Sequence, residues 1–269
     1  MSEVFHQKDT SFLQIEKWHQ LNKKLIAGFT TRNGGVSDPP FQSLNLGLHV
    51  PDNQEKIIKN RELLAKRLNI PLENWVSGEQ VHGTTVRMIN SDDKGKGTRD
   101  YFSSVQGVDG LITNEKNILC TAFFADCVPL FFYDPVTEII GIAHAGWKGT
   151  VNEMAGSMVQ AMKDQGVNES NLLVVIGPSI SQEMYEVDEK VIDNIKDKYR
   201  QKCVKPSKNN RYLLDLKKLN VEILLQSGVL RHNIDVTNYC TFKDESLFFS
   251  HRRDKGKTGR MLGFLGIIS

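Results

Sequence analysis

The chain has 269 residues, of which 39% are hydrophobic and 25% are charged, a composition typical of a soluble globular protein with a substantial core. Its 34 lysines and arginines nearly balance its 32 acidic residues, and a net charge of +2 is too small to favour nucleic acid or a membrane surface as a partner. No run approaches the roughly 18 apolar residues of a membrane span, and the amino-terminal stretch lacks the apolar segment of an export signal. The four cysteines are therefore expected to be reduced thiols, and the protein to be cytoplasmic, with no membrane or nucleic-acid partner.

The first part of the chain predicts loops that alternate with short periodic segments. Residues 30–50 are rich in Gly, Asn, Ser and Pro and predict a long loop with turns. Residues 53–68 place apolar side chains on one face and predict a helix capped by Asn53. A short strand is expected over residues 84–89, and a polar, glycine-rich loop over residues 91–104.

The densest apolar region, residues 118–144, predicts three strands. The letters DPVT between the second and the third indicate a tight turn, so these two strands are expected to form an antiparallel hairpin. The later patterns predict a helix over 151–166, a strand over 171–180, helices over 191–202 and 215–226, and a strand, basic loop and strand over 246–268. Without a repeat or a convincing linker, we expect one compact α+β domain over residues 1–269.

Three side chains with metal-binding chemistry lie at the ends of predicted strands. They are His82 in GEQVHG, Cys127 in FFADC and His144 in GIAH. Loops at one rim of a sheet could bring them together, and imidazole with thiolate suits Zn²⁺, with the fourth tetrahedral position open for water or substrate. Their separations match no short zinc motif, so spacing alone does not establish the site.

Other interpretations of the same residues stay open. A cysteine between apolar strands is often a small buried hydrophobe, and a histidine at a strand end is often a hydrogen-bonded structural group. Cys127 could also be the nucleophile of a metal-free hydrolase, with His144 or His82 as its base. Asp126 could orient a histidine, accept a proton from substrate, or cap a turn.

Glycines and cations near these residues suggest a place for an anion. The letters GWKGT begin at Gly146 and lead into a helix, whose first N–H groups could bind an anion next to Lys148. They do not form a Walker A motif, and Gly146 and Gly149 could simply permit a sharp turn. Arg61 on the first helix is a candidate for phosphate recognition, and the basic tail around residues 251–260 is expected to be a solvated or phosphate-contacting loop.

A set of motifs extends this interpretation to the whole chain. In order they are TTRNGGVS, SLNLGLHV, QVHG, ADCVPL, AHAGWKGT, IGPSI with YEV, and FFSHRRD with TGR. Together they resemble the bacterial family long labelled multicopper polyphenol oxidase or laccase-domain proteins, whose members are also regarded as zinc-containing purine nucleoside phosphorylases that deaminate adenosine. The resemblance implies a single α+β domain with mixed sheets flanked by helices, similar to Cys-His deamidating toxins. It also implies a metal site made by His82, Cys127 and His144.

The older laccase label can be tested by a count. A trinuclear copper cluster together with a blue copper needs more histidine ligands than the seven histidines of this chain. Multicopper laccase chemistry is therefore excluded, although a lone His₂Cys site could hold one copper ion adventitiously.

The expected enzyme binds purine nucleosides and phosphate. The resemblance implies phosphorolysis of adenosine, inosine, guanosine and 5′-methylthioadenosine, and deamination of adenosine. One Zn²⁺ held by His82, Cys127 and His144 would activate water, Asp126 would carry protons, and phosphate would contact Arg61 and Lys148, with Asn45 as a further polar contact. The alternatives are a Cys127/His144 amidohydrolase and a hydrolase of peptidoglycan precursors. The sequence leaves the oligomeric state open, and a monomer is one of the possibilities.

Overall fold

Two packed β-sheets form the centre of the protein. Apolar side chains on both faces of their strands bury the sheets against each other and against the covering helices. The computed structural model describes residues 3–269. In β7 (Leu119–Phe124), side chains such as Cys120 and Phe124 face the second sheet, whereas Phe123 packs on the opposite face. Because both faces of this strand are covered, its sequence is a continuous apolar run without polar alternation.

The two sheets contain six strands each and are mixed. The first has the order β1-β2-β3-β15-β7-β4, with β1 (Phe5–Asp9), β2 (Phe12–Ile15), β3 (Leu25–Thr30), β15 (Met261–Ile267), β7 and β4 (Trp75–Ser77). The second has the order β14-β10-β8-β9-β6-β5, with β14 (Ile234–Val236), β10 (Leu173–Ile176), β8 (Val128–Tyr133), β9 (Ile140–Ala145), β6 (Gly110–Thr113) and β5 (Val86–Met88). The pairs β4–β7, β5–β6 and β10–β14 are parallel and the other neighbours are antiparallel.

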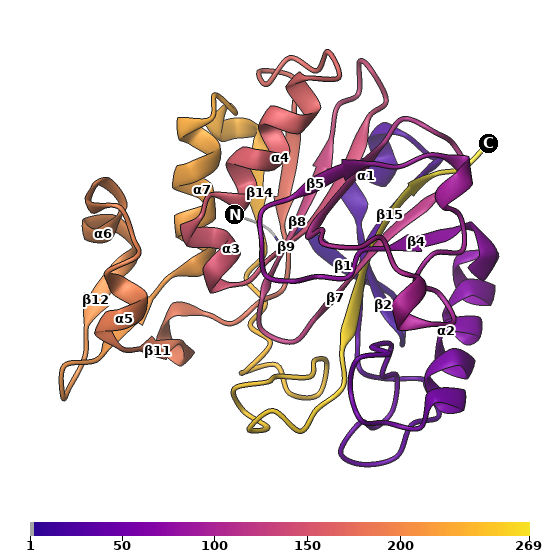
Figure 1. Cartoon of the computed structure of the whole chain (residues 1–269), viewed down its shortest axis with the longest axis horizontal. Coiled ribbons are helices and arrows are strands. Elements are labelled where there is room, and N and C mark those ends of the chain that lie inside the picture. Colours follow the sequence, from indigo (N-terminus) through magenta and orange to yellow (C-terminus); the bar gives the residue numbers. More distant parts are fainter. Residues whose placement is uncertain (1–2) are drawn as a thin grey trace.

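Helices cover the outer faces of both sheets, so the protein has four layers (Figure 1). Helix α2 (Gln54–Leu68) packs on the first sheet through side chains such as Leu64. Helices α4 (Met154–Lys163) and α7 (Leu216–Gln226) pack on the second sheet. The shorter helices are α1 (Glu16–Leu21), α3 (Trp147–Val151), α5 (Glu189–Ile192) and α6 (Asp197–Cys203), and 3₁₀ turns span Leu72–Asn74, Ser91–Asp93, Tyr101–Ser103, Gln182–Met184 and Arg231–Asn233.

A small lobe projects to one side of this four-layer body (Figure 1). It contains α5, α6 and a three-stranded sheet of order β11-β13-β12, formed by β11 (Glu186–Val187), β13 (Tyr212–Leu214) and β12 (Val204–Pro206). Among residues 3–269, no helix has both the length and the apolar character that crossing a bilayer requires.

The main predictions from local patterns are confirmed. The chain is an α+β protein with mixed sheets, and β8 pairs with β9 as the predicted antiparallel hairpin. Helix α2 begins after Asn53, whose side chain accepts a hydrogen bond from the backbone N–H of Lys56. Strand β10 ends immediately before Gly177-Pro178.

Three element predictions need correction. The helix expected over 151–166 is the shorter α4, which begins after Glu153 at a positive φ of 64°, and the separate helix α3 ends at Val151, the first residue of the predicted range. The helix expected over 191–202 is likewise divided into α5 and α6. The first strand of the tail is a loop: Phe248 and Phe249 are fully buried, but their N–H groups bond to the carbonyl oxygen of Asp244 and to the side-chain sulfur of Met261 instead of to the backbone of a neighbouring strand.

Candidate metal centre and cavity

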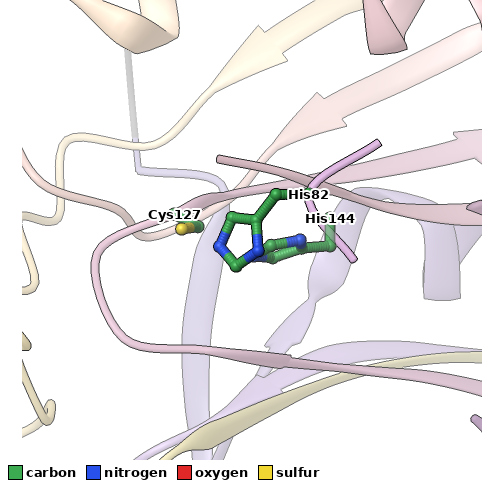
Figure 2. Close-up of side chains that lie close together, drawn as sticks. All are labelled: His82, Cys127 and His144. Atoms are coloured by element: carbon green, nitrogen blue, oxygen red, sulfur yellow. The ribbon is translucent and has the colours of Figure 1, made fainter. Parts of the chain in front are cut away.

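The ends of three chain segments bring His82, Cys127 and His144 together at one rim of the sheets. His144 is near the end of β9, Cys127 lies in the turn between β7 and β8, and His82 lies in the loop after β4. Their ligand atoms all lie within 4.8 Å of one another, and the two rings meet nearly at right angles with centroids 4.8 Å apart. Figure 2 shows the thiol and the two imidazoles gathered at this point. The expected convergence of these residues is therefore present.

The loop that carries His82 is attached to the end of β7. Gln80 forms two hydrogen bonds with the backbone of Phe123: its Nε2 donates to the carbonyl oxygen at 2.9 Å and its Oε1 accepts from the N–H at 2.7 Å. Gln80 and His82 both have positive φ angles, 63° and 62°, which non-glycine residues rarely adopt. The loop is thus held in a conformation that its residues would not prefer alone.

Asp109, which sequence reasoning missed, connects the two histidines. Its carboxylate accepts the backbone N–H groups of residues 81–83 at 3.1, 3.1 and 2.7 Å, and its Oδ1 lies 2.8 Å from Nδ1 of His144. The side chain is fully buried. The only sequence signal was an acidic residue in GVDGLIT, directly before a buried strand, where an unpaired carboxylate would be costly.

Gly146 leaves space for the three candidate ligands. Its φ of −66° is open to any residue, so backbone conformation does not require glycine here. A Cβ atom at this position would lie 2.8 Å from Cδ2 of His82 and 3.2 Å from Sγ of Cys127. Gly146 is therefore needed for close approach to the side chains.

The electrostatics of the group favour a thiolate. Burial alone would raise the pKa of Cys127, but the positive charge of His144 and hydrogen bonds from His144 and His82 outweigh burial and lower that pKa to about 6. Burial opposes protonation of His144, yet the charge of Cys127 and the hydrogen bond to Asp109 raise its pKa to about 9. Both shifts favour a thiolate on Cys127 and a proton on the imidazole of His144 when no metal is bound.

A cavity of about 600 Å³ opens over this group, a size that suits a nucleoside-sized ligand. Aromatic rings and cations share its wall. The rings belong to Tyr101, Phe123, Trp147 and Tyr185, and the basic side chains are His49, Lys148, His251, Arg252 and Arg260. Desolvation, together with the positive charges of Arg260 and Arg61, lowers the pKa of His49, so that side chain is neutral.

Lys148 and Asp126 both lie on the cavity wall, but the side chain of Lys148 is exposed whereas that of Asp126 is held by hydrogen bonds. Lys148 is exposed, and its Nζ lies 5.8 Å from the centroid of the Trp147 ring. It belongs to α3, which has only five residues, so the helix start contributes a weak dipole to the anion site that the sequence left open. The carboxylate of Asp126 accepts hydrogen bonds from Thr241 Oγ1, Ser250 Oγ and the N–H of Arg252, so its oxygens hold the basic tail in place.

Arg61 and Asn45 require correction, because neither lines the cavity. Arg61 is 1% exposed and donates hydrogen bonds to the carbonyl oxygens of residues 46, 97 and 98. Its guanidinium packs behind the ring of Phe123, 4.6 Å from the centroid, which leaves no path to a phosphate in the cavity. Asn45 is fully buried; its Oδ1 accepts the N–H groups of Gly47 and Arg260, so it supports the wall from behind.

The chain is similar to known proteins over nearly its whole length. The family described as multi-copper polyphenol oxidoreductase laccase matches residues 26–268. Purine nucleoside phosphorylase YlmD of Bacillus subtilis (strain 168) is 48% identical over 263 residues, which are 96% of this chain and 95% of that protein. Purine nucleoside phosphorylase YlmD of Geobacillus stearothermophilus is 44% identical over 90% of this chain and 89% of its own.

Solved structures show the same fold. The crystal structure of Bacillus licheniformis hypothetical protein YfiH matches with a TM-score of 0.95 and 42% identity, over 99% of this chain and 100% of that one. The structure of YlmD from Geobacillus stearothermophilus matches with a TM-score of 0.94 and 40% identity over the full length of both chains. The match in sequence and fold shows that this chain belongs to the multi-copper polyphenol oxidoreductase laccase family.

Proposed function

We propose that the chain is a zinc-dependent purine nucleoside phosphorylase that also deaminates adenosine. It would cleave adenosine, inosine, guanosine and 5′-methylthioadenosine with phosphate, releasing the base and the sugar 1-phosphate, and hydrolyse adenosine to inosine. One observation carries this proposal: two imidazoles and a thiol converge in a cavity of about 600 Å³ whose wall is aromatic and basic. The relatives named purine nucleoside phosphorylase support the reaction class.

The chemistry of the three donors fits zinc. A thiolate and two imidazoles are common ligands of this borderline-soft ion, and three protein ligands leave one position for water or substrate. The low pKa of Cys127 means that the thiolate is available at neutral pH. When bound, the ion would supply Lewis-acid chemistry beside the substrate. The same donors accept Cu²⁺, so analysis of the purified protein should quantify both metals.

The cavity wall offers separate surfaces for a base and for phosphate. The rings of Tyr101, Phe123, Trp147 and Tyr185 can stack against a purine. Among the cations, Arg260 is our candidate for phosphate. Its Nη1 donates to the carbonyl oxygens of Thr258 and Gly259, and within residues 3–269 its Nε and Nη2 have no acceptor, so they can form a fork for an oxyanion.

A metal-free thiol hydrolase is the second candidate. Cys127, His144 and Asp109 have the order of contacts of a nucleophile, a base and an orienting carboxylate. This arrangement does not need His82, whereas the zinc site does. The contribution of His82 therefore separates the two proposals.

The test is to incubate purified protein with adenosine, with and without phosphate, and to chromatograph the products. We expect adenine and ribose 1-phosphate only with phosphate, inosine in both samples, and about one zinc per chain. His82→Ala should lose zinc and both activities, while His49→Ala, on the same wall but outside the ligand group, should keep its zinc. Absence of all these products, or a fully active His82→Ala protein without metal, would reject the zinc phosphorylase.

A further inference from the structure

The structure assigns a positioning role to Asp109: we propose that its carboxylate orients both histidine ligands and supplies negative charge beside the metal. This inference rests on the proposed zinc site. Asp109 does not belong to the His-Cys-His group itself, and it acts through the residues that do. The evidence comes from its contacts with His144, from its contacts with the loop of His82, and from the charge of the site.

The first line of evidence is the double connection to His144. The backbone N–H of His144 donates to the carbonyl oxygen of Asp109 at 2.8 Å, and its Nδ1 is 2.8 Å from Oδ1 of the same residue. A carboxylate at Nδ1 keeps the proton on that nitrogen, which leaves Nε2 as the nitrogen available to a metal. Asp109 therefore sets both the tautomer and the orientation of the ring.

The second line of evidence is the loop of His82. Three consecutive N–H groups, those of Val81, His82 and Gly83, point at the carboxylate of Asp109. His82 has a φ of 62°, a conformation that persists only where surrounding contacts stabilise it. These hydrogen bonds are such contacts, and they hold the second imidazole beside the thiol and ring seen with it in Figure 2.

The third line of evidence is charge. Asp109 is fully buried, and its only ionic partner within residues 3–269 is His144. A buried carboxylate needs compensating positive charge as well as hydrogen bonds. A cysteine binds a metal as its thiolate, so a metal-bound Cys127 and the carboxylate of Asp109 would carry two negative charges, which one divalent cation between two neutral imidazoles balances. The site is thus close to neutral when a divalent metal is bound.

The experiment compares zinc binding and cobalt spectra of full-length variants. Asp109→Asn removes the charge at nearly constant volume, and Asp109→Glu keeps the charge but moves it by one methylene. The matched control is Asp134→Asn: Asp134 is also fully buried and accepts three hydrogen bonds, but from its own turn between β8 and β9. Zinc affinity is measured by competition with a chromophoric chelator, and the visible spectrum is recorded after loading with Co²⁺.

We expect zinc affinity to fall about 10- to 100-fold in Asp109→Asn, the range known for partners of metal-bound histidines. We also expect its cobalt spectrum to change, since the imidazole orientation changes, while Asp134→Asn keeps both the affinity and the spectrum. A residue that only stabilised the fold would lower the melting temperature without altering the spectrum per bound cobalt.

Two outcomes would overturn the proposal, and they are distinguishable. If wild-type protein binds zinc and Asp109→Asn matches it in affinity and spectrum, the role of Asp109 is wrong and the zinc site stands. If wild-type protein binds no zinc, the proposed function fails and this inference fails with it. Should Asp109→Asn not fold, Asp109→Glu decides in the same way, because its expected affinity is also below that of wild type.

Discussion

Cys120 and Cys127 have very different pKa values because they lie in two different regions of the protein. Cys120 lies in the interior between the sheets, and Cys127 lies at the rim where β7 and β9 end. Cys120 is fully buried among apolar side chains, and desolvation raises its pKa to about 12. Cys127 is half-buried on the cavity wall, and although burial raises its pKa, His144 and His82 lower that pKa to about 6. The comparison shows that burial among apolar groups raises the pKa of a thiol and makes it unreactive. Neighbouring cationic or hydrogen-bonding groups lower the pKa and favour the reactive thiolate.

Arg61 and Arg260 show the same contrast between the interior and the cavity rim. Arg61 belongs to the interior side of the wall and has its donors committed to backbone carbonyl oxygens. Arg260 belongs to the cavity rim, where, among residues 3–269, only its Nη1 has hydrogen-bond acceptors. Residue type therefore does not identify a functional group in this protein; its position relative to the rim does.

The largest expected effect comes from exchanging the two cysteines separately for alanine. Cys127→Ala should lose bound zinc and both proposed activities, because the thiolate ligand is removed. Cys120→Ala should keep zinc and activity and lose about 1–3 kcal/mol of stability, since it leaves a small cavity between the sheets. Metal analysis and denaturant unfolding measure the two results. Equal loss of zinc in both proteins would contradict the separation of interior and rim.

How far the sequence predicted these regions depends on the range of the signals. Local signals predicted the hairpin of β8 and β9, helix α2 and the three candidate ligands, because turns, helix caps and strand ends depend on residues that are neighbours in the sequence. The tail was mispredicted as a strand because Phe248 and Phe249 are apolar and buried, as strand residues are. Their backbone N–H groups bond to a carbonyl oxygen of the same loop and to a methionine sulfur instead of to the backbone of a neighbouring strand, which no local pattern reveals.

The missed and misplaced site residues depend on contacts far apart in sequence. Arg61 on an amphipathic helix resembles a free surface cation until the carbonyl oxygens of residues 97 and 98 are folded against it. Asp109 gains its importance only when β6 lies beside β9 and the loop of His82 closes over it. Such residues could be found from sequence only by asking which buried charge lacks a local partner.

The next effect in size sharpens the contrast between the arginines. Arg260→Gln should raise the KM for phosphate about 10- to 100-fold, the worth of one charged hydrogen-bonded contact, and leave deamination nearly unchanged because that reaction uses no phosphate. Arg61→Gln should leave the KM for phosphate near its wild-type value and destabilise the fold by about 1–3 kcal/mol, because buried carbonyl oxygens lose their donors. Phosphate titrations of phosphorolysis and of deamination distinguish these outcomes. A phosphate effect confined to Arg61→Gln would reverse the assignment.

A smaller effect is expected from crowding the rim. Gly146→Ala places a methyl group 2.8 Å from the ring of His82 and 3.2 Å from the sulfur of Cys127, so the ligands must move apart. Zinc affinity should fall by about tenfold or more, on the scale of other perturbations next to metal ligands. The matched control is Gly156→Ala in α4, where the added methyl group lies 3.3 Å from the hydroxyl of Ser227. That variant should bind zinc normally and be as stable as wild type or more stable by up to about 1 kcal/mol, provided the hydroxyl rotates away. Unchanged zinc affinity in Gly146→Ala would show that the rim has more room than its geometry indicates.

The smallest effect tests the thiols themselves through the pH dependence of alkylation in metal-stripped protein. Because the pKa of Cys127 is lowered to about 6, its thiolate predominates above pH 7 and is lost as the pH falls through 6. Its alkylation rate by iodoacetamide should therefore change little between pH 7 and 9 and fall by about tenfold between pH 7 and 5. The alkylation rate of an ordinary thiol, with a pKa of about 8.5, would instead rise more than tenfold between pH 7 and 9. Cys120 should stay unmodified in the folded protein throughout, since it is buried and its pKa is raised to about 12. Peptide mapping after short labelling times assigns each rate to its cysteine. A Cys127 rate that climbs steadily to pH 9 would mean that His144 and His82 do not offset its burial, and the rim would then resemble the interior.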